Sequence, residues 1–344
     1  MKLELLFPMH LRAAMRSVDK LPDLEEVRVR IGQPLFLYTG QKELVLVQTG
    51  EQAAFLQECS ERNVYEKAYR ITEQDLLEMQ NYISNYSLYA WQEELKNGFV
   101  TVEGGHRIGL CGGTTNQNGR IRGISYLTFF NIRVAHEKIG CANAILPFIC
   151  VKQSDGYLLT EKRSFRREIY NTLLISPPGA GKTTLLRDCI RSLSYGETLI
   201  QDFKNQRRDG GWSGMKIGLV DERSEIAACY HGIPQNDIGP RTDVLDGCNK
   251  SEGIQMLLRT MAPEVIAVDE LGTEEDFKAV EQAAYSGCKV IGTVHVGNIQ
   301  ELQEKPTLKK WCEKELFERF VFIEKGENGV RKLKVYNNRW ERLC

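Results

Sequence analysis

The sequence predicts an α/β protein of two domains, a smaller mixed α/β domain at the N-terminus and a C-terminal domain built on a parallel sheet. Three observations lead to this fold class. The 344 residues amount to about two domains of roughly 150 residues each. Short strand-like runs separated by turns fill residues 1–150. Beyond residue 168 apolar runs alternate with helical stretches, which is typical of a parallel sheet with helices on both faces.

The N-terminal domain is expected to begin with short strands and then form a helix. Alternating apolar residues predict strands at 27–31, 35–37 and 44–46, each followed by a turn with glycine. Thr72 and Asp75 have the spacing of a capping box, so a helix is expected from about Glu73 towards Leu95. Two further strands are expected at 98–102 and 131–134, and glycines 104, 105, 109, 112 and 113 between them indicate tight backbone geometry.

A polar and charged stretch at 151–168 is the candidate linker, which assigns residues 1–150 to the first domain and 169–344 to the second. Four apolar runs in the second domain predict strands of a parallel sheet, and two runs around a glycine turn near its end predict a hairpin. The expected strands are 172–176, 217–220, 265–269 and 289–294, and the hairpin pairs 320–324 with 332–336.

Composition limits the classes of function. The 45 Lys and Arg and 46 Asp and Glu give a net charge of −1, which argues against a protein that mainly coats DNA or RNA. The 10 cysteines include no CxxC pair, so free thiols in a reducing, cytoplasmic compartment are expected. Glu4 interrupts any signal sequence, and the apolar run 140–151 is too short to span a bilayer. We therefore expect a soluble protein that reaches membranes only through partners.

A glycine-rich segment lies between the expected strand 172–176 and a helix, the context of a phosphate-binding loop. Small residues let backbone N–H groups face phosphates, and the helix N-terminus adds partial positive charge. Lys182 is expected to reach the β- and γ-phosphates, and the Thr183 hydroxyl to bind Mg²⁺. Ser176 stands where such loops usually begin with glycine, at little cost if its φ is negative. The expected binding residues are Ser176, Pro177, Pro178, Gly179, Ala180, Gly181, Lys182, Thr183 and Thr184.

The apolar strand 265–268 ends in two carboxylates, Asp269 and Glu270. Carboxylate oxygens suit Mg²⁺, so Asp269 is the expected metal ligand beside Thr183. Glu270 is the expected group that polarises the attacking water. An acidic pair at a strand end is common by itself, but its place downstream of a phosphate-binding loop favours a catalytic role.

Two more predicted strands end in polar residues. Asp221 and Glu222 follow the run 217–220, and the hydroxyl of Thr293 and the imidazole of His295 lie at the end of the run 289–294. These side chains are candidates for contact with the γ-phosphate or its water, because ligands bind at the carboxyl edge of open α/β sheets. A solvated loop at 221–225 and a structural histidine remain the alternatives.

Several longer stretches have a family resemblance. Residues 258–272, LRTMAPEVIAVDELG, and the Thr293-Val294-His295 triplet are similar to the secretion and pilus ATPases of the RecA/AAA-like superfamily. Closer still is the resemblance to the stage III sporulation protein AA family. It rests on GFVTVEGGHRIG at 98–109, DERSEI at 221–226 and GPRTDVLD at 239–246, and it covers nearly the whole chain.

The resemblance implies a RecA/AAA-like P-loop ATPase of the mother cell in endospore-forming bacteria. It would form a hexameric ring with ATP at subunit boundaries. It would dock on the cytoplasmic side of the membrane complex that links mother cell and forespore. In the same comparison, Asp221 and Glu222 occupy the acidic box and His295 the histidine box. Arg107 and Arg133 match arginines that reach the nucleotide from the N-terminal domain of secretion ATPases.

The resulting hypothesis is an ATP-hydrolysing motor that uses Mg²⁺ and moves one domain against the other. Its expected catalytic residues are Glu270, Glu222, His295, Arg107 and Arg133, with Asp221 and Arg241 as further nucleotide contacts. Arginine suits a role beside phosphate because its guanidinium stabilises transition-state charge. The alternatives are a scaffold that binds ATP without hydrolysis, a secretion or pilus ATPase of another system, and a nucleic-acid motor. The near-zero charge and the lack of an interleaved basic and aromatic stripe disfavour the last.

Overall fold

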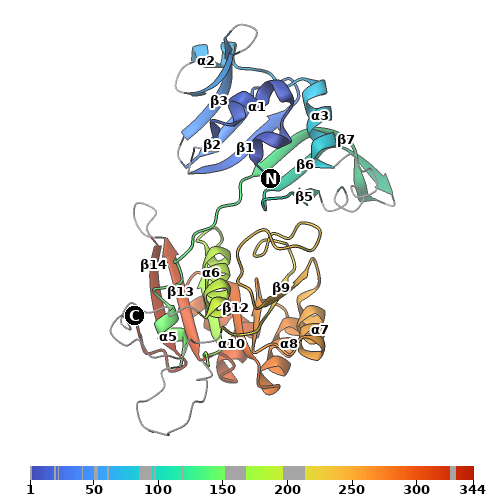
Figure 1. Cartoon of the computed structure of the whole chain (residues 1–344). Coiled ribbons are helices and arrows are strands. Elements are labelled where there is room, and N and C mark those ends of the chain that lie inside the picture. Colours follow the sequence, from blue (N-terminus) through green and yellow to red (C-terminus); the bar gives the residue numbers. More distant parts are fainter. Residues whose placement is uncertain are drawn as a thin grey trace. The chain divides into compact units, whose positions relative to one another are not determined.

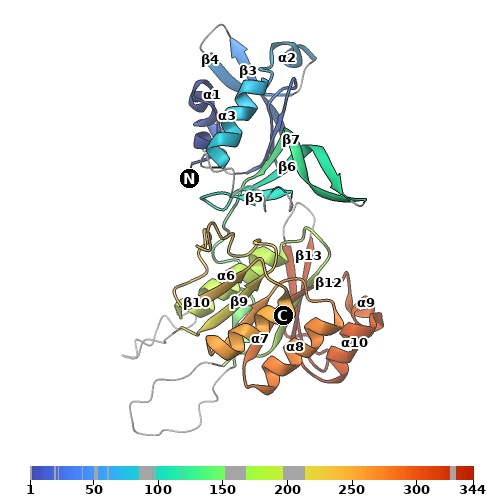
Figure 2. The same cartoon turned by 90° about the vertical axis from the view of Figure 1, so that its right-hand side faces the viewer.

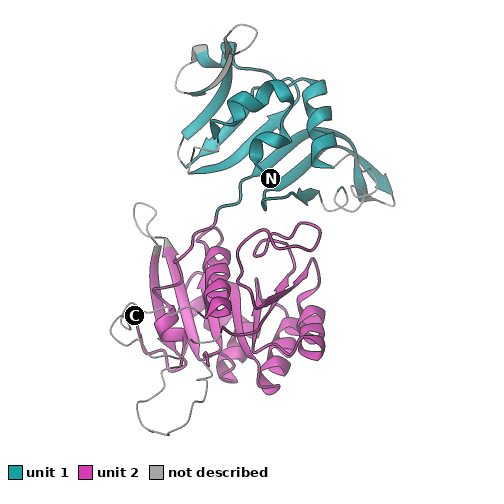
Figure 3. Ribbon diagram, viewed as in Figure 1, with its two compact units in different colours: residues 1–136 teal, residues 137–344 magenta. Residues whose placement is uncertain are grey.

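The computed structural model describes residues 2–18, 21, 23–40, 42–49, 53–59, 62–84, 95, 98–117, 119–151, 168–196, 214–325 and 331–344. The chain forms two compact units, residues 1–136 and 137–344 (Figure 3). Two domains were expected, but the boundary lies at His136 and Glu137 and not near residue 150. The reason is packing, because Ile145, Leu146 and Ile149 are buried in the core of the second unit.

The predicted linker 151–168 does not connect the two units. The backbone N–H of Val151 donates to the carbonyl of Glu168 at 2.9 Å, and Cys150 pairs with Ile169 in an antiparallel bridge. Both ends of the segment therefore lie side by side within the second unit. Residues 152–167 themselves lie outside the described ranges.

The first unit is an antiparallel sheet of seven strands in the order β4-β3-β2-β1-β7-β6-β5 (Figure 1). Short apolar runs followed by turns form its first strands, as expected. The strands are β1 (Leu24–Arg30), β2 (Phe36–Thr39), β3 (Lys42–Thr49), β4 (Ala53–Glu58), β5 (Phe99–Thr101), β6 (Arg107–Gln117) and β7 (Arg120–Arg133).

The glycine-rich segment after β5 forms a strand, β6, that periodicity does not predict. Glycine is unfavourable inside strands, and the β6–β7 register shifts three times, which breaks the alternation. One glycine is required by close approach, since a Cβ at Gly112 would lie 1.6 Å from the carbonyl oxygen of Tyr126. The tight geometry expected at this glycine therefore belongs to a bulged strand.

Helices of the first unit supply apolar residues to one core with the sheet. Leu11, Met15 and Met79 pack there with Val27 and Ile132. The capping box predicted at Thr72 and Asp75 is confirmed, but the helix ends at Ile83 instead of continuing towards Leu95. The elements are the 3₁₀ helix η1 (Leu3–Leu6), α1 (Met9–Met15), α2 (Arg62–Lys67) and α3 (Glu73–Ile83).

The second unit has a seven-stranded sheet in the order β10-β9-β11-β12-β8-β13-β14. All neighbouring strands are parallel except β13 and β14, which form the expected hairpin. This arrangement confirms the predicted parallel sheet and adds β10 at its edge. The strands are β8 (Thr172–Ser176), β9 (Ile217–Asp221), β10 (Thr242–Asp246), β11 (Val265–Val268), β12 (Lys289–His295), β13 (Arg319–Lys325) and β14 (Arg331–Asn337).

Helices cover both faces of this sheet (Figure 2). Because side chains alternate along a strand, Leu174 packs with residues of α5 and α6, whereas Leu173 and Ile175 pack with α7, α8 and α10. The helices are α5 (Leu146–Ile149), α6 (Lys182–Tyr195), α7 (Lys250–Thr260), α8 (Glu274–Tyr285), α9 (Ile299–Glu304) and α10 (Pro306–Glu313).

Candidate functional site

The phosphate-binding loop has the strand, loop and helix order expected from its sequence. β8 is buried throughout and ends at Ser176 in extended geometry, so serine at this position needs no left-handed backbone. Gly179 and Gly181 have φ of 74° and 94°, a region that glycine adopts readily. Gly181 is the residue before α6, so the helix N-terminus begins at the loop. A loop of this kind at a helix N-terminus is the geometry in which backbone N–H groups can bind phosphate.

Lys182 lies in the first turn of α6 with only 5% of its surface exposed. Its Nζ lies 3.0 Å from Nδ1 of His295. Burial lowers the pKa of Lys182, and the negative charges of Asp269, Glu270 and Glu225 offset only part of that effect. A buried ammonium favours an anionic ligand, because a charged group out of water needs a compensating charge. The residue therefore fits the predicted contact with phosphate.

The hydroxyl of Thr183 donates to Oδ2 of Asp269 at 3.1 Å. The other carboxylate oxygen of Asp269 accepts a hydrogen bond from the hydroxyl of Thr293, and it also accepts one from the backbone N–H of Glu270 at 3.0 Å. A hydroxyl and a carboxylate side by side are oxygen ligands of the kind that Mg²⁺ takes. The structure thus brings together the two residues predicted to bind the metal.

Glu270 is held by its backbone and by both carboxylate oxygens. Its φ of 49° lies in the left-handed region, and its N–H donates to the hydroxyl of Thr293 at 2.9 Å. Oε1 lies 2.7 Å from Nε2 of His295, and Oε2 lies 2.9 Å from Nη1 of Arg223. Burial raises the pKa of Glu270, but the His295 hydrogen bond and the Arg223 charge outweigh it and hold that pKa below its ordinary value. The side chain is therefore an ionised carboxylate at neutral pH.

The contacts of His295 assign its ring proton. An ammonium can only donate a hydrogen bond, so Lys182 donates to Nδ1 of His295. The proton of a neutral ring then lies on Nε2, which donates to Glu270. The imidazole links Lys182 to the predicted catalytic carboxylate. This arrangement favours the functional interpretation of His295 over a purely structural one.

Strand order explains why these residues meet. β8 lies beside β12, with Ser176 opposite His295, and β11 lies between β12 and β9. Because all four strands are parallel, their carboxyl ends lie at one edge of the sheet. Asp269 directly follows β11, which places it near the start of α6. The predicted site is therefore assembled by the topology of the second unit alone.

Asp221 is near this edge but has a different role from the one predicted. Its carboxylate is 1% exposed and accepts the backbone N–H groups of Glu225, Ile226 and Ala227 at 2.8–2.9 Å. Both oxygens are used in shaping the turn that follows β9. The structure therefore assigns Asp221 to the backbone of this turn and not to direct contact with the γ-phosphate.

The buried Asp221 makes a prediction for stability against pH. Burial raises the pKa of Asp221 to about 6, although the three backbone N–H groups lower it. As the pH falls, Asp221 of the folded chain therefore binds a proton near pH 6, whereas in the unfolded chain it binds one only near pH 4. From pH 7 to pH 5, the wild type should gain about 1 kcal/mol of unfolding free energy relative to Asp221→Asn. Urea titrations at both pH values measure this difference, and parallel pH dependences would contradict it.

Two other predicted contacts are directed elsewhere. Glu222 forms an ion pair with Lys250 at the start of α7. Arg241 donates from its backbone to the Ser194 hydroxyl at 2.7 Å and from Nη1 to the Ser194 carbonyl at 2.9 Å. Ser194 lies at the C-terminal end of α6, whereas the phosphate-binding loop lies at its N-terminal end. Within this chain Arg241 therefore caps a helix and does not contact the predicted nucleotide site.

The two candidate arginines of the N-terminal domain lie in the first unit. Arg107 on β6 and Arg133 on β7 face each other in the strand register. The guanidinium of Arg107 lies 3.7 Å from the centre of the Phe99 ring, a cation–π contact. Their predicted contact with nucleotide stays a prediction.

The contacts that Thr293 and Arg223 make with the cluster were not predicted from the sequence, although the Thr293 hydroxyl was a candidate contact of the γ-phosphate. The cluster consists of Lys182, Thr183, Asp269, Glu270 and His295 with these two residues. Thr293 is fully buried and joins Asp269 to the backbone of Glu270. Arg223 reaches Glu270 from the turn after β9. Both lie within stretches singled out for their polar strand ends, but the sequence gives no signal for the pairing. The contact between Arg223 and Glu270 depends on β9 and β11 being neighbours.

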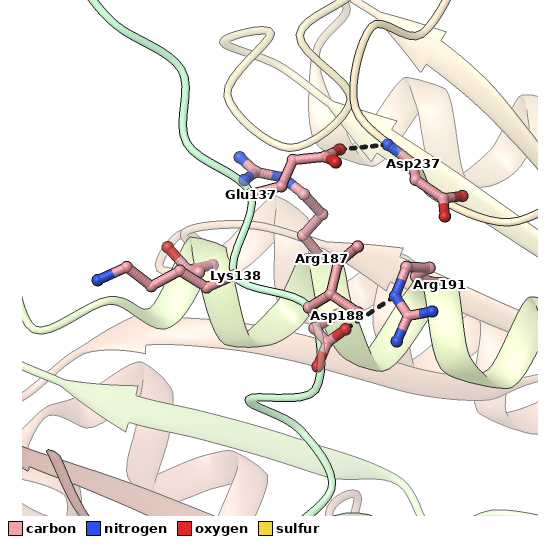
Figure 4. Close-up of a pocket in the computed structure, with 8 residues that line it drawn as sticks. Glu137, Lys138, Arg187, Asp188, Arg191 and Asp237 are labelled. Carbon is pink, nitrogen blue, oxygen red and sulfur yellow. Dashed lines mark hydrogen bonds and ion pairs between the residues drawn. The ribbon is translucent and has the colours of Figure 1, made fainter. Parts of the chain in front are cut away.

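A small hollow lies beside α6 and is lined by residues of the 137–139 segment, α6 and Asp237 (Figure 4). Its volume of about 10 Å³ has room for about one water molecule. Glu137 accepts the backbone N–H of Asp237, and Asp188 accepts that of Ala142 at 2.8 Å. The predicted loop residue Thr184 contributes to this lining and not to the described contacts of Asp269 and Glu270. The hollow thus marks where the start of the second unit is fastened to α6.

Two searches of the described residues bear on metals and membranes. In those ranges no group of three or more His, Cys, Asp or Glu is arranged to hold a metal ion. A Mg²⁺ ion needs no such group, because it usually keeps waters and takes phosphate oxygens beside one or two carboxylates. Every helix in the described part of the chain is too short or too polar to cross a membrane.

Fold and site together define the class of protein. It has the fold of the secretion and pilus ATPases, with a phosphate-binding loop at the carboxyl edge of a parallel sheet. The Legionella pneumophila ATPase DotB matches with a TM-score of 0.52 and 15% identity, over 94% of this chain and 79% of that chain. The pilus retraction motor PilT, solved with bound ADP, matches with a TM-score of 0.52 and 16% identity, over 95% of this chain and 81% of that chain. At this identity the likeness concerns the fold, and it confirms the predicted fold class.

Sequence comparison identifies the family. The family described as "Sporulation stage III, protein AA" matches residues 3–343. Stage III sporulation protein AA of Bacillus subtilis (strain 168) is 37% identical over 315 residues, which cover 92% of this chain and 87% of that protein. The chain belongs to the stage III sporulation protein AA family, as its motifs predicted.

Proposed function

We propose that this chain binds ATP with Mg²⁺ at the carboxyl edge of its second sheet and hydrolyses it. One observation carries the proposal: a single connected cluster joins the loop lysine, the Thr183–Asp269 pair and the Glu270–His295 pair. A phosphate-binding loop alone would support binding. An ionised carboxylate held beside it supports hydrolysis as well.

Each group has a chemical role in this proposal. Lys182 and the loop N–H groups bind the phosphates, where their positive charge compensates the anion. Thr183 and Asp269 would hold Mg²⁺, which would supply neutralisation of the phosphate charge. Glu270 orients the attacking water and accepts its proton, which an ionised carboxylate can do. His295 keeps Glu270 in position through Nε2.

Two measurements test the proposal. Fluorescent-nucleotide titration should show Mg²⁺-dependent binding, and a phosphate-release assay should show steady turnover of ATP. Binding without turnover would favour the alternative of a non-hydrolysing scaffold. Absence of binding at millimolar nucleotide would overturn both readings.

At the level of the cell, the proposed role is to power or assemble the channel complex between mother cell and forespore from its cytoplasmic side. Membership of the family supports this role. The chain would act as a homo-oligomer, a hexameric ring in which Arg107 and Arg133 approach nucleotide. Light scattering with and without a non-hydrolysable ATP analogue tests the ring, since a particle of unchanged monomer mass in both samples would contradict it.

A further inference from the structure

Among the described contacts of Glu270, one comes from the turn after β9. This contact is made by the side chain of Arg223. Its Nη1 lies 2.9 Å from Oε2 of Glu270, while Oε1 is held by His295. Both oxygens of the proposed water-orienting carboxylate are therefore engaged. The Arg223 and His295 contacts take up acceptor sites of Glu270 and therefore compete with water for this carboxylate.

The backbone that carries Arg223 is firmly held. The turn is closed by the Asp221 carboxylate. Arg187 of α6 also binds it, donating to the carbonyls of Glu225 and Ile226 at 2.7 and 2.6 Å. Ser224 has a left-handed φ of 53° and donates to Asp246 at 2.6 Å. The guanidinium is therefore presented from a fixed base at the edge of the sheet.

The side chain of Arg223 can exchange partners more easily than that of His295. It is 59% exposed, whereas that of His295 is 36% exposed and is held at both ring nitrogens. Exposed ion pairs contribute little to stability, so the contact with Glu270 can open at small cost. A terminal phosphate offers more negative charge than a carboxylate and three acceptor oxygens, which suit the fork of a guanidinium.

We propose that Arg223 binds the terminal phosphate of a nucleoside triphosphate and thereby releases Oε2 of Glu270 to orient water. This inference rests on the proposed function and adds a residue that distinguishes triphosphate from diphosphate. Before the triphosphate binds, the Arg223–Glu270 pair keeps the carboxylate occupied. A diphosphate lacks the group that draws Arg223 away, so it leaves the pair intact.

The test compares ADP with a non-hydrolysable ATP analogue, by calorimetric or fluorescence titration of the full chain. Arg223→Gln should weaken analogue binding about tenfold and change ADP binding less than twofold. Arg223→Lys keeps the charge but not the fork, so it should recover part of the analogue affinity. Arg259→Gln, an exposed arginine on α7, is the matched control and should change neither.

Phosphate release adds a kinetic readout. Arg223→Gln should lower kcat as well as the analogue affinity. Equal losses of affinity for ADP and for the analogue would show a merely structural role of Arg223 and would overturn the inference. Binding and turnover by the wild type would then still support the proposed function. Failure of the wild type to bind either nucleotide would overturn both.

Glu270→Gln gives an independent check within the same pair. A neutral amide cannot hold Arg223 by charge, so this variant should bind the analogue more tightly than the wild type. Adding Arg223→Gln should remove that gain. Additive effects of the two changes on analogue affinity would contradict the exchange of partners, because residues that compete for one contact are coupled.

Discussion

Glu270→Gln should lower kcat for ATP hydrolysis by about 10²–10⁴-fold, the range expected for loss of a general base. The amide keeps the size of the side chain and can still accept the hydrogen bond of His295. It cannot take a proton from water. ATP affinity should therefore be retained or increased while turnover is lost. Steady-state phosphate release and nucleotide titration of the same preparation measure the two quantities.

Glu275→Gln is the matched control for this change. Glu275 is exposed in the first turn of α8 and takes part in none of the described contacts of the cluster, and its variant should keep the kcat of the wild type. Turnover by Glu270→Gln within about threefold of the wild type would remove Glu270 from the mechanism. The geometry would then leave water activation to another group.

Lys182→Met should have the second large effect, on binding. The change removes the ammonium from the first turn of α6, where only 5% of the surface of Lys182 is exposed. ATP affinity should fall about 100-fold, equivalent to about 3 kcal/mol for a hydrogen bond between charged groups. The free protein should not lose stability, because the methionine side chain fills similar space without the cost of a buried charge.

The readouts are nucleotide titration and thermal unfolding without nucleotide. Lys278→Met, on the exposed side of α8, is the control and should leave affinity unchanged. An unfolding temperature several degrees lower for Lys182→Met would show that the lysine mainly stabilises the fold. Unchanged ATP affinity with a normal unfolding temperature would refute the phosphate contact.

Local sequence was sufficient for much of the second unit. The strand, loop and helix around Ser176 to Thr183 are contiguous, so their order alone predicted the phosphate-binding loop. The strands ending at Asp269 and His295 were visible as apolar runs. In the first unit the capping box at Thr72 was visible as well, since its two partners are three residues apart.

Periodicity failed where the backbone departs from regular alternation. β6 carries glycines and three register shifts, so its residues do not alternate between two faces. β10 has charged residues at Asp243 and Asp246 and lies at the sheet edge, where its pattern resembles a loop. The domain boundary was misplaced because the burial of Ile145 and Ile149 depends on α6, which is distant in sequence.

The sequence alone therefore predicted the residues of the proposed phosphate site, which are Lys182, Thr183, Asp269, Glu270 and His295. Only the tertiary structure decided how they are connected. It assigned Asp221 to a backbone turn and Arg241 to a helix end, and it set Arg223 against Glu270. The physical reason is that local backbone preferences lie within a few residues, whereas side-chain partners across an edge follow from the order of parallel strands.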